Sequence, residues 1–461
     1  MTLPRSTPEA EGIASSAILD FIRAADDQLD SLHSVMVVRH GAVVAEGWWT
    51  PYAAQYPHMM FSVSKSFTST AVGLAIDEGL ITLDDRVVDL LPHDLPTVID
   101  DRLSALTVRH LLTMTTGHAA DTVNLTDDSH GDNWARTILA QPLEFTPGTH
   151  YVYNSGATHL LSAILQRATG ERLLDYLGPR LFEPLGISDA TWESSPQGVD
   201  AGGWGLSITT EQLATFGQLL LQRGQWNGGQ LVPAEWIDEA TAGQVDTSST
   251  DHDLDGRQGY GYQFWRNRLA GYRADGAFGQ FCLVLPEQDA VVVLTSALPV
   301  AQAALDLVWE HLLPAFGDSV LPASESPLAG ALTALTLPTV AGEATSATAD
   351  RVAGIRFPFD HPSVTAVTVE SGRLTVDENG AITVIQVGHG DWVGSADSRI
   401  WASGAWVSPD TLVVRAHAVM TPYSRTATLT FADDIVTFDV TQNVAFGDVP
   451  PHTHVVSVPR R

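Results

Sequence analysis

The first two thirds of the chain combine short apolar runs with apolar positions at helical spacing. Residues 34–46 (SVMVVRHGAVVAE) predict two strands around a His-Gly turn, and residues 280–297 predict a hairpin. Between them, apolar side chains recur at helical spacing from Ser62 to Glu78, and Gly79 stands where a C-terminal cap is expected. Strands at both ends with helices between them predict an α/β domain whose terminal strands pair in one sheet.

Beyond residue 316 the composition shifts to Ser, Ala, Thr and Pro, with one short apolar helix (PLAGALTALTLP). From about residue 346 apolar positions alternate with period two, as in TLVVRAHAV, which predicts an antiparallel β barrel or sandwich. We therefore expect a domain at 1–316 with a helical insertion at about 80–225, a linker at 317–345 and a β domain at 346–461. Because the β domain carries no reactive cluster, we expect it to have a structural or substrate-gating role.

Composition and charge narrow the range of partners. The 461 residues are 44% hydrophobic, and no window reaches the roughly 18 uninterrupted apolar residues of a membrane span, so we expect a cytoplasmic protein. The formal net charge of −30 argues against nucleic acid and anionic membranes as partners. The single cysteine, Cys282, lies in the apolar run FCLVL and is expected to be a buried strand residue.

Three groups of acidic or histidine residues resemble parts of metal sites. The run from Asp251 to Gly256 copies the first half of an EF-hand loop, but its twelfth position is Tyr262 rather than glutamate. The other two groups are His452 with His454, and the cluster Asp127, Asp128, His130 and Asp132. Neither has further ligands at a telling spacing. We therefore expect a solvated acidic loop and two surface loops, with no metal and no cofactor.

The chain contains one lysine, Lys65, three residues after Ser62 in the stretch FSVSKSF. A guanidinium effectively never loses its proton, whereas an ammonium can, so a lone lysine beside serines indicates a proton acceptor. On a helix the two side chains share a face, and a serine at a helix start has a free N–H near the positive end of the dipole. For this role the pKa of Lys65 must fall from about 10.4 towards neutrality. The alternative is a surface lysine left by chance.

Three further motifs accompany Ser-x-x-Lys in a fixed order. They are PGTHYVYNSGATHLLSAIL, GGWGLSITTEQLATFGQLLLQRGQW and DGAFGQFCLVLPEQDAVVVLTSA. With them, residues 5–315 resemble the serine β-lactamase and penicillin-binding-protein superfamily, and within it the class C β-lactamase-related hydrolases, which include family VIII carboxylesterases and 6-aminohexanoate-dimer hydrolases. The resemblance implies an α+β fold: an α/β sandwich of the β-lactamase/transpeptidase type with a helical insertion.

The resemblance also implies roles for individual residues. Ser62 matches the nucleophile, Lys65 its partner base, and Tyr153 the tyrosine that acts as general base and then as acid; Tyr151 is the local rival by spacing. A phenol next to a cationic lysine is expected to lose its proton more easily. The backbone N–H groups of Ser62 and Ala277 match the oxyanion hole, although the Gly-rich stretch GAFGQ also fits a simple strand bulge.

Two departures from the family pattern bear on the substrate. Ser155 stands where related β-lactamases carry asparagine, and no second lysine exists to form the Lys-Thr-Gly triplet, which Arg273 is not obviously placed to replace. Both departures count against efficient β-lactam turnover. We expect Ser155, Gly276, Trp204 and Tyr262 to contribute to substrate binding. The wider set of candidate pocket walls is aromatic, although an aromatic residue of this kind is individually more often a core residue: Trp48, Trp49, Trp204, Tyr260, Tyr262 and Trp265.

These observations predict a metal-independent serine hydrolase that cleaves a small ester or amide through an acyl-enzyme on Ser62. Carboxylesterase activity is expected first, then hydrolysis of linear amides or D-amino-acid peptides, and β-lactamase activity last. The alternative from another class is a non-catalytic sensor or ligand-binding protein on the same fold.

Overall fold

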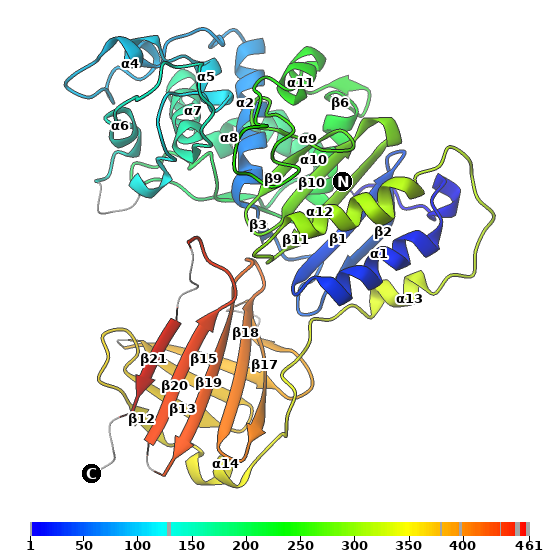
Figure 1. Cartoon of the computed structure of the whole chain (residues 1–461), viewed down its shortest axis with the longest axis vertical. Helices are drawn as coiled ribbons and strands as arrows, with labels where there is room; N and C mark the ends of the chain where they lie inside the picture. Colours follow the sequence, from blue (N-terminus) through cyan, green and yellow to red (C-terminus); the bar gives the residue numbers. More distant parts are fainter. Residues whose placement is uncertain are drawn as a thin grey trace. The chain divides into compact units, whose positions relative to one another are not determined.

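The computed structural model describes residues 2–126, 131–378, 380–395, 399–433, 435–447 and 452–457, which form two compact units (Figure 1). The first unit comprises Met1–Gly47, Pro57–Ser296 and Val300–Thr333. The second comprises Trp48–Tyr56, Ala297–Pro299 and Ala334–Arg461. Unlike the domains expected from composition, neither unit is continuous in sequence.

A six-stranded antiparallel sheet forms the centre of the first unit. Its order is β2 (Ala42–Trp48), β1 (Leu32–Arg39), β11 (Ala290–Ser296), β10 (Gln280–Leu285), β9 (Tyr272–Gly276) and β8 (Trp265–Arg266). The terminal strands pair as expected, with Val37 opposite Val292, and the predicted hairpin joins β10 to β11. Every residue of β1, β10 and β11 is buried, so helices cover the sheet on both faces.

Helices from both ends of the unit pack on this sheet. Figure 1 shows α1 (Ser15–Gln28) and α12 (Gln302–Leu307) in front of the strands, and α10 (Thr210–Leu221) packs on β1, β10 and β11 from behind. A Cβ at Gly217 of α10 would lie 2.6 Å from the Sγ of Cys282, so glycine permits this close approach. Cys282 is fully buried as predicted, and burial raises the pKa of its thiol to about 12.

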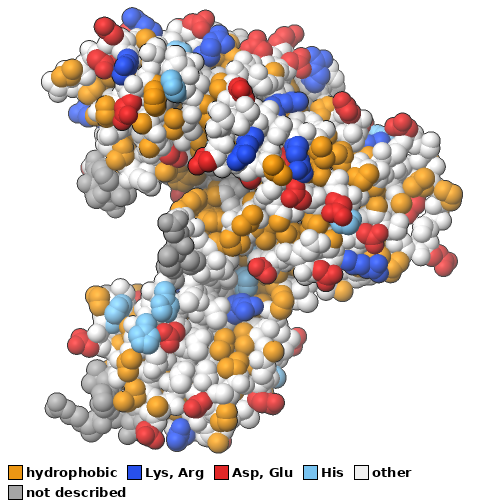
Figure 2. Space-filling view, viewed as in Figure 1, with side chains coloured by type: hydrophobic (Ala, Val, Ile, Leu, Met, Phe, Trp, Pro, Cys, Tyr) orange, Lys and Arg blue, Asp and Glu red, His pale blue; other side chains and the backbone are white. Residues whose placement is uncertain are grey.

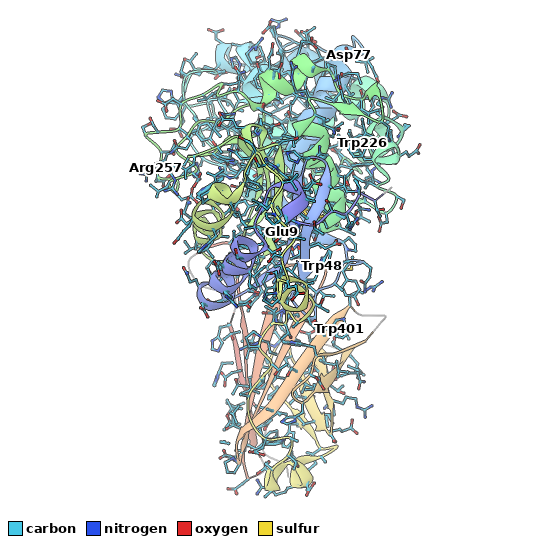
Figure 3. All side chains as sticks on the ribbon, turned by 90° about the vertical axis from the view of Figure 1, so that its right-hand side faces the viewer. Glu9, Trp48, Asp77, Trp226, Arg257 and Trp401 are labelled. Atoms are coloured by element: carbon cyan, nitrogen blue, oxygen red, sulfur yellow. The ribbon has the colours of Figure 1, made fainter. Side chains whose placement is uncertain are left out.

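The start of α1 is fixed by Glu9, which is labelled in Figure 3. Its carboxylate accepts a hydrogen bond of 3.0 Å from the Ser15 N–H.

The segment between β2 and β8 is mainly helical and extends beyond the insertion expected at about residues 80–225. It comprises α2 (Ser64–Asp77), α3 (Val87–Leu90), α4 (Asp101–Ala105), α5 (Val108–Leu112), α6 (Trp134–Leu139), α7 (Ser155–Thr169), α8 (Leu173–Leu177), α9 (Glu183–Leu185), α10 and α11 (Ala234–Thr241). Short strands join them: β3 (His58–Met59), β5 (Leu206–Ile208) and β4 (Thr191–Trp192) form one small sheet, and β6 (Gln225–Trp226) pairs with β7 (Gly229–Gln230). The apolar helix α2 packs against α7 and α8 and is buried along most of its length. Of the helices described, none is long and apolar enough to cross a membrane.

The second unit is a β sheet that curls into a half-barrel, which confirms the expected β architecture. Its order is β12 (Arg356–Pro358), β13 (Ala366–Glu370), β14 (Arg373–Glu378), β15 (Ala381–Gly388), β17 (Ile400–Ser408), β18 (Thr411–Ala418), β19 (Ser424–Ala432), β20 (Ile435–Gln442) and β21 (His452–Val456). β16 (Val393–Ser395) also pairs with β17, and two short helices, α13 (Leu328–Thr333) in the first unit and α14 (Ala347–Val352) in the second, precede the barrel. All strand pairs are antiparallel except β15 with β17.

A short early segment of the chain belongs to this second unit. Thr50 donates its N–H to the Leu335 carbonyl at 3.1 Å and accepts from the Leu337 N–H at 2.8 Å. The neighbouring side chains of Trp49 and Tyr52 are buried. The second unit is therefore built from pieces that are far apart in sequence.

The structure corrects two expectations about the candidate metal groups. Asp255, predicted to lie in a solvated loop, is fully buried and accepts hydrogen bonds from Gln302 at 2.8 Å and from Trp309 at 3.0 Å. Both bonds go to Oδ2, and Oδ1 accepts from the Arg268 N–H at 2.7 Å, so Asp255 is a structural acceptor. His452 and His454, predicted to lie in a surface loop, belong to strand β21 beside Asp439 of β20.

The remaining metal candidates and the surface charges give no sign of a cation site. Asp127, Asp128 and His130 lie outside the described residues. Within the described residues, no three or more His, Cys, Asp or Glu side chains are grouped to hold a metal ion. Acidic side chains are scattered over the face shown in Figure 2 rather than gathered in one patch.

Candidate active site

Ser62 lies on a short 3-10 turn, Phe61–Val63, that leads into α2, so the α-helix expected to begin at Ser62 begins two residues later, at Ser64. The backbone of Phe61 has a φ of 46°, a left-handed conformation that bulky residues seldom adopt and that concentrates at functional sites. The Ser64 hydroxyl donates to the Phe61 carbonyl at 2.6 Å and accepts from the Leu206 N–H at 3.1 Å. These bonds tie the turn to β5 and fix the direction of the Ser62 side chain.

The Nζ of Lys65 lies among three oxygens. It is within hydrogen-bond distance of Ser62 Oγ at 2.8 Å, Ser155 Oγ at 3.1 Å and the Gly203 carbonyl at 2.8 Å. The side chain is 1% exposed. Ser62 comes from the turn before α2, Ser155 from the start of α7, and Gly203 from the glycine-rich loop before β5, so three separate segments meet at one amine. The contact of Lys65 with the Gly203 carbonyl was not predicted, because the sequence motif identifies the loop but not which of its backbone groups faces Lys65.

The surroundings of Lys65 favour its neutral form. Burial lowers the pKa of Lys65 to about 7, although the carboxylates of Asp121 and Asp275 oppose the shift. This is the shift that a proton acceptor at this position requires, and it excludes the reading of Lys65 as a surface residue.

Asp121 is a site residue that the sequence does not reveal. Its carboxylate accepts from the Ser155 N–H at 2.7 Å and from the Ser155 hydroxyl at 3.1 Å. The neighbouring Asn154 caps α7 through Gly156 and accepts from Thr122, which fixes the loop that carries Asp121. No motif or spacing marks Asp121, because it lies in a loop 34 positions from its partner.

The ring of Tyr153 lies beside Lys65, with its centroid 4.8 Å from Nζ, and stacks on Trp265 at 5.7 Å. Burial raises the pKa of Tyr153 above its ordinary value, and the hydrogen bond with Ser62 opposes the shift without cancelling it. The expectation that this phenol would lose its proton easily is therefore wrong. Burial outweighs both the hydrogen bond with Ser62 and the charge of Arg273, which lower the pKa.

Tyr151, the rival of Tyr153, lies in the same aromatic cluster but makes different contacts. Its ring approaches Tyr260 at 5.5 Å and Trp265 at 6.2 Å. Its hydroxyl is buried and has no hydrogen-bond partner among the described residues. The phenol that touches both Lys65 and Ser62 is that of Tyr153.

The segment after β9 lies next to the turn that carries Ser62. A Cβ at Gly276 would lie 2.3 Å from the Met60 carbonyl oxygen, so only glycine permits this approach. Ala277 follows, and Phe278 has a left-handed φ of 64° and packs its ring edge-on against Phe61 at 5.4 Å. The backbone of Ala277 is thus held near the Ser62 turn by a glycine contact and an aromatic contact.

Arg273 is not free to replace the missing Lys-Thr-Gly lysine. Its guanidinium is 2% exposed and donates to Asp275 at 2.7 Å and to Asn267 at 3.1 Å. Burial raises the pKa of Asp275, and the charge of Arg273 opposes that shift. Arg273 and Asp275 therefore form an ion pair with each other on β9.

The two aromatic residues expected to bind substrate pack against other side chains of the first unit, and Trp204 directly follows Gly203, whose carbonyl contacts Lys65. Trp204 stacks on Trp134 at 5.9 Å. Tyr262 is 1% exposed, and its hydroxyl accepts from Arg109 at 2.8 Å. Among the aromatic candidates, Trp265 and Tyr260 are the ones that surround Tyr153.

Comparison with known proteins shows which family the chain resembles, independently of the site geometry. A family model described as Beta-lactamase matches residues 25–312. The chain is 27% identical over 282 residues to the 6-aminohexanoate-dimer hydrolase of Paenarthrobacter ureafaciens, a match that covers 57% of this chain and 72% of that protein. It is 28% identical over 184 residues to Esterase EstB of Burkholderia gladioli, covering 35% of this chain and 46% of that protein.

Among solved structures, the octameric penicillin-binding protein homologue from Pyrococcus abyssi is similar in fold. The comparison gives a TM-score of 0.51 at 16% sequence identity and covers 96% of this chain and 99% of the other. The similarity in fold therefore includes the C-terminal β unit as well as the sheet and helices of the first unit.

Proposed function

Because this chain belongs to the beta-lactamase family and is a serine hydrolase of the kind that acts on esters or amides, we propose that it forms a covalent acyl-enzyme on Ser62. In this proposal Lys65 is the base, Tyr153 is the acid, and water releases the acyl group. The observation that carries it is the contact of 2.8 Å between Ser62 Oγ and the buried amine of Lys65.

The three oxygens around Lys65 accept the three N–H groups of its ammonium, and in the neutral amine that we propose two of these hydrogen bonds remain. A neutral amine has two N–H groups and one lone pair. The hydroxyl of Ser155 and the carbonyl of Gly203 accept the two N–H groups, which leaves the lone pair for the Ser62 O–H. As Ser62 Oγ bonds to the substrate carbonyl carbon, its proton moves to Nζ and the carbonyl π electrons become an oxyanion. We infer that the N–H groups of Ser62 and Ala277 stabilise this oxyanion.

Tyr153 then completes the first half of the reaction. Because burial raises its pKa, the phenol keeps its proton at neutral pH and can donate it to the oxygen or nitrogen of the leaving group as the carbonyl re-forms. The ammonium of Lys65 returns a proton to the phenolate through a water molecule. A water then attacks the acyl-enzyme, with its proton taken by the same amine, and Ser62 is released with its hydroxyl restored.

The surroundings support neutral ester or amide substrates over carboxylate-bearing ones. Asp121 and Asp275 are the charged groups that act on the amine of Lys65, and Arg273, the cation on β9, is paired with Asp275. A substrate carboxylate would meet these two acidic groups, and Arg273, the arginine on β9, is already paired with Asp275. This arrangement supports carboxylesterase activity first and β-lactam hydrolysis last.

The test is intact-protein mass spectrometry after mixing with a short-chain p-nitrophenyl ester, with chromophore release followed in parallel. We expect wild type to gain the mass of one acyl group and to release p-nitrophenolate, and Ser62→Ala to do neither. Ser69→Ala is the matched control, because this buried hydroxyl on α2 has no hydrogen-bond partner among the described residues. A wild-type protein that neither takes up the label nor turns over any acyl donor would leave a non-catalytic binding protein as the conclusion.

A further inference from the structure

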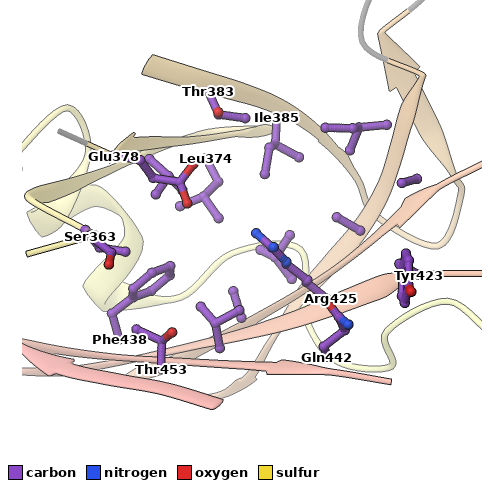
Figure 4. A pocket seen from close by; sticks show the side chains of 18 of the residues that line it. Ser363, Leu374, Glu378, Thr383, Ile385, Tyr423, Arg425, Phe438, Gln442 and Thr453 are labelled. Carbon is purple, nitrogen blue, oxygen red and sulfur yellow. The ribbon is translucent and has the colours of Figure 1, made fainter. Parts of the chain in front are cut away.

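The half-barrel of the second unit contains a cavity of about 590 Å³. Ligand pockets in proteins span roughly 300–1,000 Å³, so the cavity has the size of a small-molecule site. Figure 4 shows it between strands of the half-barrel. Most of its lining is aliphatic: Val364, Leu374, Val376, Ile385, Ile400, Val414, Ala416, Ala418, Ala427 and Val440, with Phe438 at one side.

The cavity exists because inward-facing side chains become smaller along neighbouring strands. At one end of the half-barrel, paired residues such as Leu412 and Leu429 fill the core together with aromatic rings. Two residues further along β18 and β19, the pair is Val414 and Ala427, which leaves the space between the sheet walls open. A core without a ligand would be expected to fill this space to normal packing density.

One cation points into this space. Arg425 continues the inward row of β19, and its neighbours across the strands are Ala416 and Gln442. Figure 4 shows its side chain directed into the cavity. Among the residues that the structure describes, none forms a hydrogen bond or an ion pair with its guanidinium. Arg425 is exposed to solvent. Its guanidinium stays charged and can bind a carboxylate through two parallel N–H donors.

The one acidic residue in the lining does not fill that role. Glu378 lies at the end of β14, near Ser363, on a different part of the wall from Arg425 (Figure 4). No ion pair joins the two among the described residues. The aliphatic side chains of Leu374 and Ile385 line the wall between Glu378 and the open end of the cavity. The lining therefore combines a long apolar surface with one solvent-exposed cation that has no ion-pair partner among the described residues.

We propose that this cavity binds an amphipathic monocarboxylate with an aliphatic body of medium chain length. The carboxylate lies on Arg425, and the aliphatic body lies along the apolar side chains of β14, β15, β18 and β20. Burial of an apolar chain contributes about 25 cal/mol per Å² of buried surface, and the charged hydrogen bonds fix its orientation. This site shares no residue with the Ser62 site, so the proposal does not depend on the proposed hydrolase activity.

The first test is isothermal titration calorimetry of the full chain with dodecanoate, dodecanol and dodecylammonium below their micelle concentrations. We expect saturable one-site binding of dodecanoate, about tenfold tighter than dodecanol because a charged hydrogen bond is added. Dodecylammonium should bind more weakly than either. If dodecanoate does not bind, or if dodecylammonium binds more tightly and so selects Glu378, the proposal is wrong.

Variants locate the binding site. Arg425→Gln should weaken dodecanoate binding about tenfold and leave dodecanol unaffected. Arg415→Gln is the matched control, because Arg415 lies on the opposite face of the neighbouring strand β18, and it should bind like wild type. Ala416→Phe should fill the cavity and abolish binding of both ligands, with thermal unfolding used to confirm that the variant folds. Equal dodecanoate affinity in Arg425→Gln and wild type would overturn the proposal.

A further variant separates this site from the active site. Dodecanoate is a carboxylic acid, the product that an esterase releases, so binding at Ser62 must be distinguished. We expect Ser62→Ala to bind dodecanoate as wild type does. Loss of binding in Ser62→Ala, with retention in Arg425→Gln, would place the ligand in the hydrolase site and refute the second site, while leaving the proposed hydrolase function intact.

Discussion

The amine of Lys65 lies 2.8 Å from the hydroxyl oxygen of Ser62, inside a pocket that leaves 1% of the lysine side chain exposed. Because the same burial lowers the pKa of the amine to about 7, the contact joins a hydroxyl that needs a proton acceptor to an amine that is partly neutral at physiological pH. An arginine at this position could hold the hydrogen bonds but not accept the proton.

The pH dependence of hydrolysis should report this amine. Only neutral Lys65 has a lone pair, so kcat/KM for a p-nitrophenyl ester should be low below pH 7, where the ammonium dominates. It should rise to a plateau above that pH, with a midpoint near the pKa of about 7. Lys65→Arg should lose about 10²–10⁴-fold in kcat/KM at every pH, because the guanidinium stays protonated. A profile that is flat through this pH range in wild type would contradict the role of Lys65 as base.

Asp121→Asn should move that midpoint to lower pH. The Asp121 carboxylate raises the pKa of Lys65, so removing its charge allows the pKa to fall further while the shape of the side chain is kept. The measurement is the pH profile of kcat/KM. Asp20→Asn, an exposed residue on α1, is the control and should leave the midpoint unchanged. A midpoint that stays in place or rises in Asp121→Asn would exclude Asp121 as a positioning residue for the amine.

Removing the hydroxyl of Tyr153 and removing that of Tyr151 should have very different effects on kcat/KM. Tyr153→Phe removes the phenol that contacts Ser62 and should lower kcat/KM by about 10²–10⁴-fold. Tyr151→Phe removes a hydroxyl without a hydrogen-bond partner among the described residues and should leave kcat/KM close to wild type. Ultraviolet difference spectra should show no tyrosinate at neutral pH, because burial raises the pKa of Tyr153. Equal losses in the two variants would indicate general damage to the aromatic cluster rather than proton transfer.

Gly276→Ala should damage catalysis more than substrate binding. A Cβ at this position would lie 2.3 Å from the Met60 carbonyl oxygen and would push the Ala277 backbone away from the Ser62 turn. We expect kcat to fall about 10²-fold or more, the size of losing one oxyanion donor, with a smaller change in KM. Gly73→Ala on α2 is the control variant. Its Cβ would lie 2.4 Å from the ring of Trp236, which belongs to α11. It should lower the unfolding temperature without a similar loss of kcat in the folded protein.

Elements with strong periodicity could be predicted from the sequence, and contacts between distant loops could not. The α2 helix, the β10–β11 hairpin and strand β18 follow directly from their apolar spacing. Strand β17 was missed because its centre, Ala402 to Ala405, is built of small residues that carry no alternation. Asp121 was missed because only the folded loop brings it to Ser155.

The burial of individual side chains also could not be predicted from residue types alone. The lone lysine indicated a lowered pKa correctly, since a base at that position requires one. The same reasoning failed for Tyr153, whose enclosure by Trp265 and Tyr260 raises its pKa instead. Asp255 is a similar case: its spacing suggested a wet loop, whereas Gln302 and Trp309 enclose it.

The discontinuous make-up of the second unit limits how the gene can be rearranged. Residues Trp48–Tyr56 and Ala297–Pro299 belong to that unit although they are encoded within the hydrolase region, and Thr50 pairs with Leu335 and Leu337. A stop codon near position 320 would leave Trp49 and Tyr52 without the partners that bury them. Recombination at a single crossover can therefore transfer every strand of the half-barrel but not the whole second unit, which is encoded in three separate stretches.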